Sequence, residues 1–393
     1  MSLNEKKLKI CQVITRMIVG GAQENTLFTI IGHLQKGHEV VLLTGPSPGP
    51  EGQLLQKADF PDFEVVEMPS MVREINPLLD FKAYFEMKKF FRERKFDVVH
   101  THCSKAGIIG RVAAWNAGVP LVVHTVHGQA FHPYEKPWKN YMFKASERWA
   151  AKHCHHIFTV AQAMIDQCVQ SGIAPAEKYS VVYSGMEINK FLNSKPEPEL
   201  RQQLGIPENV KVIGAVARLF PQKGYEYFIP AAGKIVEKYP DTHFLIVGNG
   251  TMREAMDRQL KAMGLTDHFH FAGLIPPDQV YRYIAHMDIL LHLSLHEGLP
   301  RAVVQALASG KPAIGFALDG TPEVITDNQT GFLAIPENVD SVVEGVLKIL
   351  GDPALAEQMG RNGKQLVAQK FDWHYMADVL EQEYYRLLKA GKK

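Results

Sequence analysis

The residues best suited to chemistry lie in one stretch, Leu290–Phe332, which reads LLHLSLHEGLPRAVVQALASGKPAIGFALDGTPEVITDNQTGF. We expect a buried strand to end at His296-Glu297-Gly298, and Pro300 suits the first position of the helix that follows. Backbone N–H groups at the start of a helix lack intrahelical partners and favour an anion such as a diphosphate. Glu297 is placed to accept hydrogen bonds from ligand hydroxyls. Gln305, on the second turn of that helix, can reach other hydroxyls of the same ligand.

Glycine-containing turns occur where further parts of such a site are needed. Each half of the chain starts with a strand that runs into one: VITRMIVGGAQ (Val13–Gln23) and GAVARLFPQKG (Gly214–Gly224). A Gly-Thr-Pro-Glu turn, Gly320–Glu323, is expected to open another helix near Glu297. Ligands of open α/β sheets bind beyond the carboxyl ends of the strands. These turns are therefore predicted to line the binding site.

Strands and helices alternate along the chain. Short apolar runs rich in Val, Ile and Leu are typical of parallel strands that are buried on both faces. The predicted strands are Leu8–Ile14, Glu39–Leu43, Phe63–Val66, Phe96–His102, Pro120–Thr125, Tyr179–Val182, Val210–Ala217, His243–Val247, Asp288–Leu293 and Ala313–Phe316. Segments of helical period between them include Asn25–Gln35, Phe81–Arg94, Tyr225–Lys238 and Arg301–Ser309. The alternation predicts parallel α/β architecture with right-handed crossovers.

The pattern is interrupted around Ser184–Asn209, a proline-containing and charged stretch in which we expect no strand. We place the interdomain linker there. The fold predicted is therefore two Rossmann-like doubly wound parallel-sheet domains that face an interdomain cleft. Residues 1–184 form the first domain and residues 185–370 the second, while the C-terminal helix, 371–393, packs back on the first.

The composition excludes several protein classes. The 393 residues are 46% hydrophobic and 22% charged, which is typical of a globular protein. The 43 Lys and Arg residues balance 42 Asp and Glu residues, so the chain has no general attraction for nucleic acid. The four cysteines form no CxxC pair. With no signal-peptide core at the N-terminus and no apolar run of transmembrane length, we expect a cytoplasmic protein with reduced thiols.

Several motifs together resemble the family-4 retaining glycosyltransferases of the GT-B fold. In HEGLP, Glu297 matches the first glutamate of the family's E-x7-E signature. ARLFPQKG resembles the R-x4-K pair, through Arg218 and Lys223. GGAQ (Gly20–Gln23), VGNGTMRE (Val247–Glu254) and YSGMEINKF (Tyr183–Phe191) are similar to three further family motifs in the same order. Each motif alone is weak evidence, but their conjunction across nearly all of the chain is strong.

The resemblance implies a role for each matching residue. Arg218 and Lys223 would grip the donor diphosphate, and two cations there stabilise the charge that develops on the leaving phosphate. Glu297 would contact the donor sugar, and His127, in HTVHG, would hydrogen-bond near its hydroxyls. The remaining donor-binding residues would be Gly20, Gly21, Gly298, Leu299, Pro300 and Gln305.

Two positions depart from the family pattern. Gln305 stands where the second glutamate would bind ribose, so it can hydrogen-bond a diol but brings no charge. Ser184 replaces the usual Asn of the linker motif. These departures bear on donor affinity and on the choice of nucleotide.

The implied activity is that of a glycosyltransferase (EC 2.4) of hexosyl or N-acetylhexosaminyl type. It would move a sugar from a nucleoside-diphosphate sugar to an acceptor hydroxyl, with retention of anomeric configuration, in cell-envelope or polysaccharide synthesis. The acceptor domain would be residues 1–184 and the donor domain 185–370. No cofactor and no metal are expected, and domain closure would exclude water.

Other interpretations stay open on the sequence alone. The chain can be a nucleotide-sugar-binding protein without transferase activity, or another GT-B enzyme such as an epimerase. A phosphorylase would need pyridoxal phosphate, for which no lysine motif is evident. A dehydrogenase is disfavoured because no GxGxxG follows the first strand.

Histidine-rich and basic-aromatic stretches raise two further questions. His153-Cys154-His155-His156 cannot converge on one metal ion in a helix or a strand, and we interpret it as a helix end. The stretches Phe81–Phe96 and His132–Lys144 mix lysines with aromatic residues. They are compatible with peripheral contact with the inner face of a membrane, or with helices that pack an apolar stripe on the sheet. A glycan or a lipid-linked acceptor therefore fits the sequence.

Overall fold

The structure is a computed structural model that describes residues 6–47, 54–56 and 61–391. The first residues of the chain and residues 392–393, the end of the predicted C-terminal segment, lie outside the described part. The chain divides into two compact units. The first unit is Met1–Met186 with Asp372–Lys393, and the second unit is Glu187–Phe371. The sequence places the change between domains after Ser184, close to the first of these crossings.

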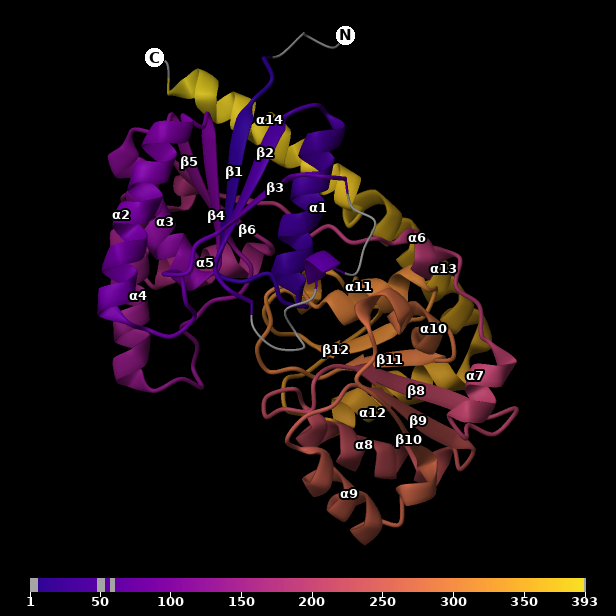
Figure 1. The fold of residues 1–393 in the computed structure, drawn as a ribbon. Coiled ribbons are helices and arrows are strands. Elements are labelled where there is room, and N and C mark those ends of the chain that lie inside the picture. Colours follow the sequence, from indigo (N-terminus) through magenta and orange to yellow (C-terminus); the bar gives the residue numbers. More distant parts are fainter. Residues whose placement is uncertain (1–5, 48–53, 57–60, 392–393) are drawn as a thin grey trace. The chain divides into compact units, whose positions relative to one another are not determined.

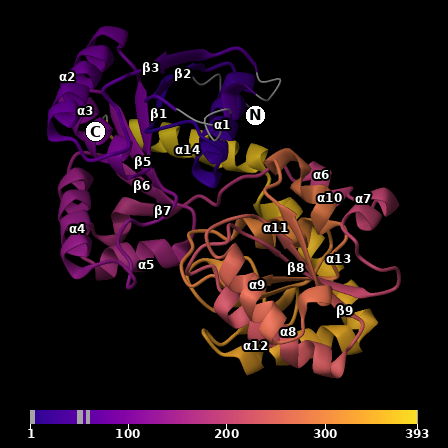
Figure 2. The same ribbon diagram turned by 60° about the horizontal axis from the view of Figure 1, so that its bottom comes forward.

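The first unit contains a seven-stranded parallel sheet in the order β3-β2-β1-β4-β5-β6-β7. Figure 1 labels β1 to β6 of this sheet, and Figure 2 labels β7. Its strands are β1 Lys9–Ile14, β2 Glu39–Thr44, β3 Glu64–Glu67, β4 Val98–His102, β5 Leu121–Val126, β6 His156–Thr159 and β7 Tyr179–Val181. Its α-helices are α1 Gly21–Gln35, α2 Pro77–Arg94, α3 Ser104–Ala117, α4 Pro137–Ala151, α5 Gln162–Gln170 and α14 Trp373–Ala390. Short 3-10 turns, η1 Leu54–Gln56 and η2 Ala176–Lys178, complete it.

Both faces of this sheet are covered because successive strand residues point to opposite sides. Cys11 and Val13 of β1 pack with buried residues of α2 and α3, whereas Ile10 packs in a cluster with α14. The C-terminal helix α14 lies along α1 in both views (Figures 1 and 2). Asp372 caps α14, and Glu381 binds Lys36 at 2.5 Å across this helix pair.

The second unit contains a six-stranded parallel sheet in the order β10-β9-β8-β11-β12-β13. Its strands are β8 Lys211–Val216, β9 Thr242–Val247, β10 Phe269–Gly273, β11 Ile289–His292, β12 Ala313–Phe316 and β13 Gly331–Ala334. Its α-helices are α6 Asn189–Leu192, α7 Pro198–Gln203, α8 Tyr225–Lys238, α9 Arg253–Ala262, α10 Val280–Ile284, α11 Arg301–Ala308, α12 Val339–Gly351 and α13 Pro353–Lys370. The 3-10 turns are η3 Thr266–His268, η4 Pro277–Gln279 and η5 Thr321–Glu323.

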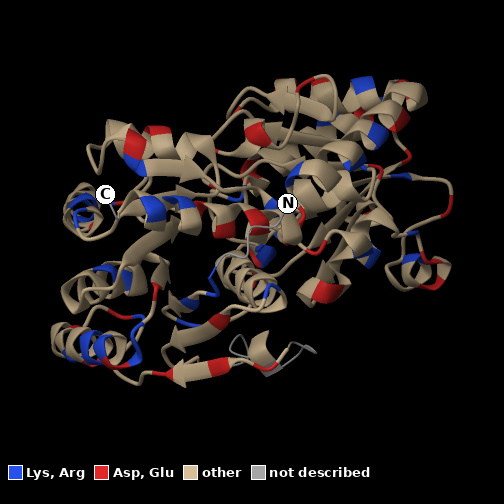
Figure 3. Ribbon diagram, turned by 90° about the horizontal axis from the view of Figure 1, so that it is seen from above, with Lys and Arg blue, Asp and Glu red and all other residues tan. Residues whose placement is uncertain are grey.

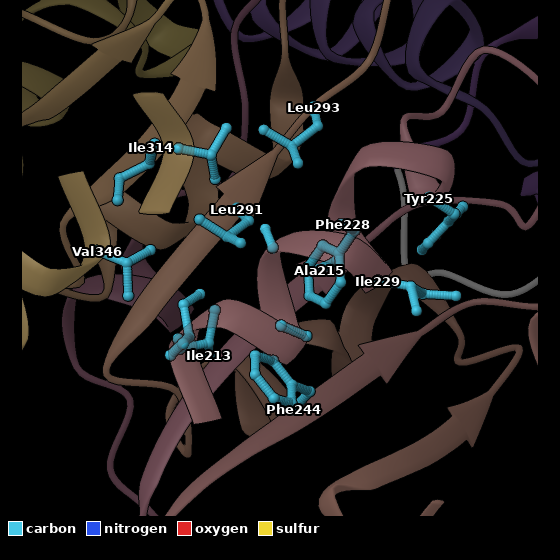
Figure 4. Close-up of a cluster of buried hydrophobic side chains, with 14 of the residues drawn as sticks. Ile213, Ala215, Tyr225, Phe228, Ile229, Phe244, Leu291, Leu293, Ile314 and Val346 are labelled. Carbon is cyan, nitrogen blue, oxygen red and sulfur yellow. The ribbon is translucent and has the colours of Figure 1, made fainter. Parts of the chain in front are cut away.

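The core of the second unit holds its functional turns in place. Ile213 of β8, Phe228 of α8 and Leu291 of β11 meet in one buried cluster with Phe244 and Ile314 (Figure 4). Helices α8 and α12 cover this face of the sheet. Because β11 is buried along its whole length and β8 is buried from Val212 to Ala215, the loops that follow these two strands leave the sheet from fixed positions.

The predicted α/β fold with two parallel sheets is confirmed, and three strands were not foreseen. These are β6, β10 and β13, each of only four or five residues. The predicted helix end at His153–His156 is only partly right. His153 lies 2.9 Å from the carbonyl of Trp149, at the end of α4, but His156 already begins β6.

Three local expectations are compared with the structure in detail. The stretch Ser184–Asn209 contains two short helices, α6 and α7, and Glu197 in it binds Arg282 at 2.6 Å. Most of this stretch lies in the second unit, Glu187–Phe371. The turn at Gly320–Glu323 opens a short 3-10 helix, η5. Phe371, the predicted start of the C-terminal helix, is the C-cap of α13, and the last helix begins at Trp373.

Candidate functional site

The strand order of each sheet reverses at one point. In the second unit this switch lies between β8 and β11, and in the first unit between β1 and β4. Crevices at such switch points are where open α/β sheets bind ligands. The turns that follow β8 and β11 carry the predicted residues Arg218, Lys223 and Glu297.

The two turns of the second unit are locked together by their backbones. The N–H of Leu295 donates to the carbonyl of Gln222 at 2.9 Å. Gly224 has a φ of +80°, and a Cβ at this position would lie 2.0 Å from the carbonyl oxygen of Leu293. Glycine is required here both for the left-handed conformation and for the close approach. This contact sets where Lys223 stands relative to the turn after β11.

The turn that follows β9 supports the loop that follows β8. Leu219 donates its N–H to the carbonyl of Asn249 at 3.0 Å, and its own carbonyl accepts from Met252 at 2.9 Å. A Cβ on Gly250 would lie 2.3 Å from the Leu219 carbonyl oxygen. The motif VGNGTMRE therefore braces the loop that bears Arg218 and Lys223.

Lys223 and Glu297 form an ion pair at the centre of this site. Lys223 Nζ lies 2.6 Å from Glu297 Oε1, and the two side chains are 25% and 21% exposed. His292, at the end of β11, places its Nε2 3.6 Å from the same oxygen. Burial of the Glu297 carboxyl raises its pKa, but the charge and hydrogen bond of Lys223, with further contributions from the neighbouring His292 and Ser294, outweigh this, and the pKa lies below its ordinary value. The carboxylate is therefore ionised at neutral pH.

Asp319 holds the backbone of Glu297. Its carboxylate accepts from the Glu297 N–H at 2.8 Å and lies 3.2 Å from His296 Nδ1. Asp319 itself has a φ of 48°, an uncommon conformation for a residue with a side chain. Neither Asp319 nor His292 was predicted from the sequence as a site residue. The Asp-Gly pair just before the TPE turn was the one available signal for Asp319.

The other predicted donor-binding residues of this unit lie close in sequence to Lys223 or to Glu297. Arg218 is exposed, with its guanidinium carbon 5.1 Å from the centre of the Phe220 ring. Pro300 is the N-cap of α11, which begins at Arg301 as the predicted helical segment does, and Gln305 is half-buried on that helix. Leu299 is only 7% exposed, so a ligand would meet its backbone rather than its side chain.

In the first unit the predicted residue His127 directly follows β5 and is half-buried. Its Nε2 lies 2.9 Å from Nδ1 of His102, at the end of β4, and Nε2 of His102 lies 2.7 Å from Gln12 Oε1. Burial first, and then the charges of His100 and His127, lower the pKa of His102 well below its ordinary value. A neutral His102 that donates to the Gln12 oxygen must accept at Nδ1, so His127 donates from Nε2. His102 thus fixes the orientation of His127.

Gly20 and Gly21 lie at the other side of the switch point of the first unit. Gly20 is the N-cap of α1, and its φ of 176° is extended backbone that any residue adopts. A Cβ on Gly20 would meet the side-chain oxygen of Gln23 at 2.6 Å. The helix start formed by Gly21 offers backbone N–H groups, which suit an anionic or hydroxylic ligand.

Positively and negatively charged residues are interspersed along the chain (Figure 3).

Aromatic side chains are exposed on two helices of the first unit. On α4, Trp138, Tyr141 and Trp149 are 62%, 76% and 50% exposed. On α2, Phe81 and Phe85 are 66% and 50% exposed. Among the described helices, none has the length and apolar character needed to cross a membrane.

The described residues contain no group of three or more His, Cys, Asp and Glu side chains that can hold a metal ion. Two cationic side chains, Arg218 and Lys223, lie on the loop after β8.

Comparison with known proteins places this geometry in context. Residues 26–185 match the family described as glycosyl transferase 4-like domain, and residues 196–366 match glycosyl transferases group 1. The Escherichia coli UDP-Gal:alpha-D-GlcNAc-diphosphoundecaprenol alpha-1,3-galactosyltransferase is 29% identical over 98% of each chain. The 2-deoxystreptamine glucosyltransferase of Streptomyces kanamyceticus is 28% identical over 78% of this chain and 81% of the relative.

Solved structures share the fold. The Anabaena protein Alr3699/HepE, determined in complex with UDP, has a TM-score of 0.80 and is 23% identical. The match covers 96% of this chain and 100% of that one. A glycosyltransferase from Rickettsia africae ESF-5 also has a TM-score of 0.80, at 19% identity over 98% and 100% of the two chains.

Proposed function

We propose, from the premise that this chain belongs to the family-4 glycosyltransferases of the GT-B fold, that it transfers a hexose from a UDP-sugar to a lipid-linked glycan. The transfer retains the anomeric configuration and serves cell-envelope glycan synthesis. The relative from Escherichia coli supports the choice of uridine, of a hexose and of a diphosphate-lipid acceptor, since it matches along 98% of both chains.

The observation that carries this proposal is the Lys223–Glu297 pair at the switch point of the second unit. A diphosphate needs cations, and a sugar needs hydrogen-bond acceptors next to them. Lys223 offers the first and Glu297 the second within 2.6 Å of each other. Arg218, on the same loop, adds a second cation with bidentate geometry. We assign donor binding to the second unit and acceptor binding to the first.

The chemical role of each residue follows from where charge develops. As the bond between the anomeric carbon and the phosphate oxygen breaks, negative charge grows on the leaving diphosphate. Arg218 and Lys223 stabilise that charge without a metal ion or another cofactor. Glu297 orients the sugar through its hydroxyls, and the Asp319 carboxylate fixes the Glu297 backbone. His127, oriented by His102, hydrogen-bonds to a substrate hydroxyl.

Peripheral membrane contact is part of the proposal. Trp138, Tyr141 and Trp149 follow helical spacing and share one exposed face of α4. Aromatic side chains of this kind sit well at the headgroup level, and lysines on α2 and α4 add attraction for anionic lipid. Cosedimentation with anionic vesicles tests this contact. We expect Trp138→Gln with Trp149→Gln to reduce binding, whereas zwitterionic vesicles should bind neither protein.

Transfer itself is tested with radiolabelled UDP-galactose and UDP-glucose, each with undecaprenyl-diphosphate-linked N-acetylglucosamine. We expect one donor to give a radiolabelled lipid product, and the NMR coupling of its new anomeric proton reports the configuration. If the protein binds a UDP-sugar but neither transfers the sugar nor slowly hydrolyses the donor, it is a binding protein rather than an enzyme. Failure of every UDP-sugar to bind would overturn the assignment of the nucleotide.

A further inference from the structure

His292 is a buried histidine that the proposed chemistry does not use. It is the last residue of β11 and is 6% exposed. Within the described part of the chain, its Nε2 has no hydrogen-bond partner. A buried polar atom without a partner is costly, so such an atom at a functional site calls for an explanation.

The direction of His292 gives that explanation. Its Nε2 points to Glu297 Oε1 at 3.6 Å, too far for a hydrogen bond but close enough for strong electrostatic interaction. Lys223 Nζ forms an ion pair with the same oxygen at 2.6 Å. One carboxylate oxygen therefore faces two potential cations, and in this structure the lysine holds it.

Donor binding changes this balance. A diphosphate that engages Lys223 draws the ammonium toward its own oxygens and brings additional negative charge. Glu297 then loses part of its nearest counter-charge in a half-buried site, where an unpaired carboxylate is unfavourable. His292 is the remaining titratable group that faces it, because the charged and titratable groups acting on His292 are Glu297 and Lys223.

Resting on the proposed donor site, we propose that His292 is a positioning residue for Glu297 that takes up a proton from solvent when a UDP-sugar engages Lys223. The imidazolium then hydrogen-bonds to Oε1 and holds the carboxylate in the orientation that the sugar hydroxyls require. Donor binding and protonation of His292 favour each other, so donor affinity rises as the pH falls toward 6.

The state before donor binding agrees with this sequence of events. Burial lowers the pKa of His292, Glu297 raises it and Lys223 lowers it, with a net value below the ordinary one. The histidine is thus neutral while the lysine is in place. Removal of the lysine charge leaves the carboxylate to act alone and moves the pKa upward.

Proton uptake is measured by calorimetric titration of the full-length protein with UDP-galactose, in buffers of different ionisation enthalpy between pH 5.5 and 7.5. The diphosphate of a UDP-sugar has no terminal monoester, so the ligand itself does not titrate in this range. We expect the wild type to take up as much as about one proton per donor bound. His292→Gln and Glu297→Gln should take up none, and the matched control His268→Gln should behave as the wild type.

Two further readouts separate positioning from folding. In Lys223→Gln, NMR titration should show the pKa of His292 raised relative to the wild type, with no donor present. The pH profile of kcat/KM for His292→Gln should lose the dependence on this group that His268→Gln retains. Equal uptake by His292→Gln and wild type, or an unchanged His292 pKa in Lys223→Gln, would overturn the inference while leaving the donor site intact. If UDP-galactose and other UDP-sugars do not bind at all, both the proposed function and this inference are wrong.

Discussion

Replacement of Glu297 by glutamine separates the two functions that its carboxylate serves. Glutamine keeps the size of the side chain but removes the charge that Lys223 pairs with at 2.6 Å. Exposed ion pairs contribute about 0.2–1 kcal/mol, whereas breaking a buried pair costs about 3–5 kcal/mol. Since the two side chains are 25% and 21% exposed, we expect a loss of about 1–2 kcal/mol. For a unit of this size the melting temperature then falls by about 2–8 °C.

The pH dependence of this loss has a definite sign. The pKa of Glu297 is lowered in the folded protein, so its contribution to stability is complete above the unfolded value of about 4.3. It is lost as the pH falls through the lower folded value. The difference in free energy of unfolding between wild type and Glu297→Gln should therefore be constant near pH 7 and should disappear as the pH falls below about 4. Denaturant unfolding at several pH values measures this difference.

The effect on activity should divide between binding and turnover. Without its carboxylate partner, Lys223 is free for the diphosphate, so UDP should bind Glu297→Gln at least as tightly as the wild type. The sugar is no longer oriented, and we expect kcat to fall about 10²–10³-fold. Calorimetry with UDP and steady-state transfer assays measure the two quantities, with Glu226→Gln, an exposed carboxylate in the first turn of α8, as the matched control. A parallel loss of UDP affinity in Glu297→Gln would refute the competition between carboxylate and diphosphate.

Three further outcomes are expected. Asp319→Ala should lower kcat by about tenfold or more with little change in UDP affinity, because it frees the Glu297 backbone; a normal kcat would show that this contact is dispensable. His102→Phe should reproduce most of the kcat loss of His127→Ala, and the double variant should be no worse than the single ones; additive losses in a double-mutant cycle would argue against coupling. Burial, together with the neighbouring His38 and Lys36, lowers the pKa of His33 to about 3. The unfolded chain therefore binds a proton at His33 below about pH 6.5, whereas the folded chain does not bind one there until the pH is much lower. His33→Phe should therefore gain about 2 kcal/mol relative to wild type between pH 8 and pH 5, measured by denaturant unfolding, and a pH-independent difference would contradict the assignment.

The sequence predicted the architecture because apolar strand runs and helical periods alternate without ambiguity over most of the chain. Ala313–Phe316 and Tyr225–Lys238 are found with the predicted bounds. The strands that were missed are short, and β6 begins with His156, whose side chain bonds to Ser180 rather than packing in an apolar core. Such strands are specified by pairing with their neighbours, which local pattern does not reveal.

In the candidate site, too, some residues were predicted from local motifs, whereas others were not. Lys223 and Glu297 were identified from their motifs, but their ion pair depends on contact between two turns 74 residues apart. Asp319 and His292 join this site through strand order and backbone hydrogen bonds. No local pattern in the sequence marks His102 as a site residue, and its contact with His127 follows from the adjacency of β4 and β5. Side chains that orient other side chains carry no local signature.

We expect the loop after β8 to bind the diphosphate of the donor through Arg218 and Lys223. Calorimetric titration of UDP with wild type and with Arg218→Gln/Lys223→Gln, at fixed ionic strength, tests it most directly. We expect the double variant to remain folded and to bind UDP at least about 100-fold more weakly, as the loss of two charge-assisted contacts requires. Equal affinity of the two proteins for UDP would contradict the account.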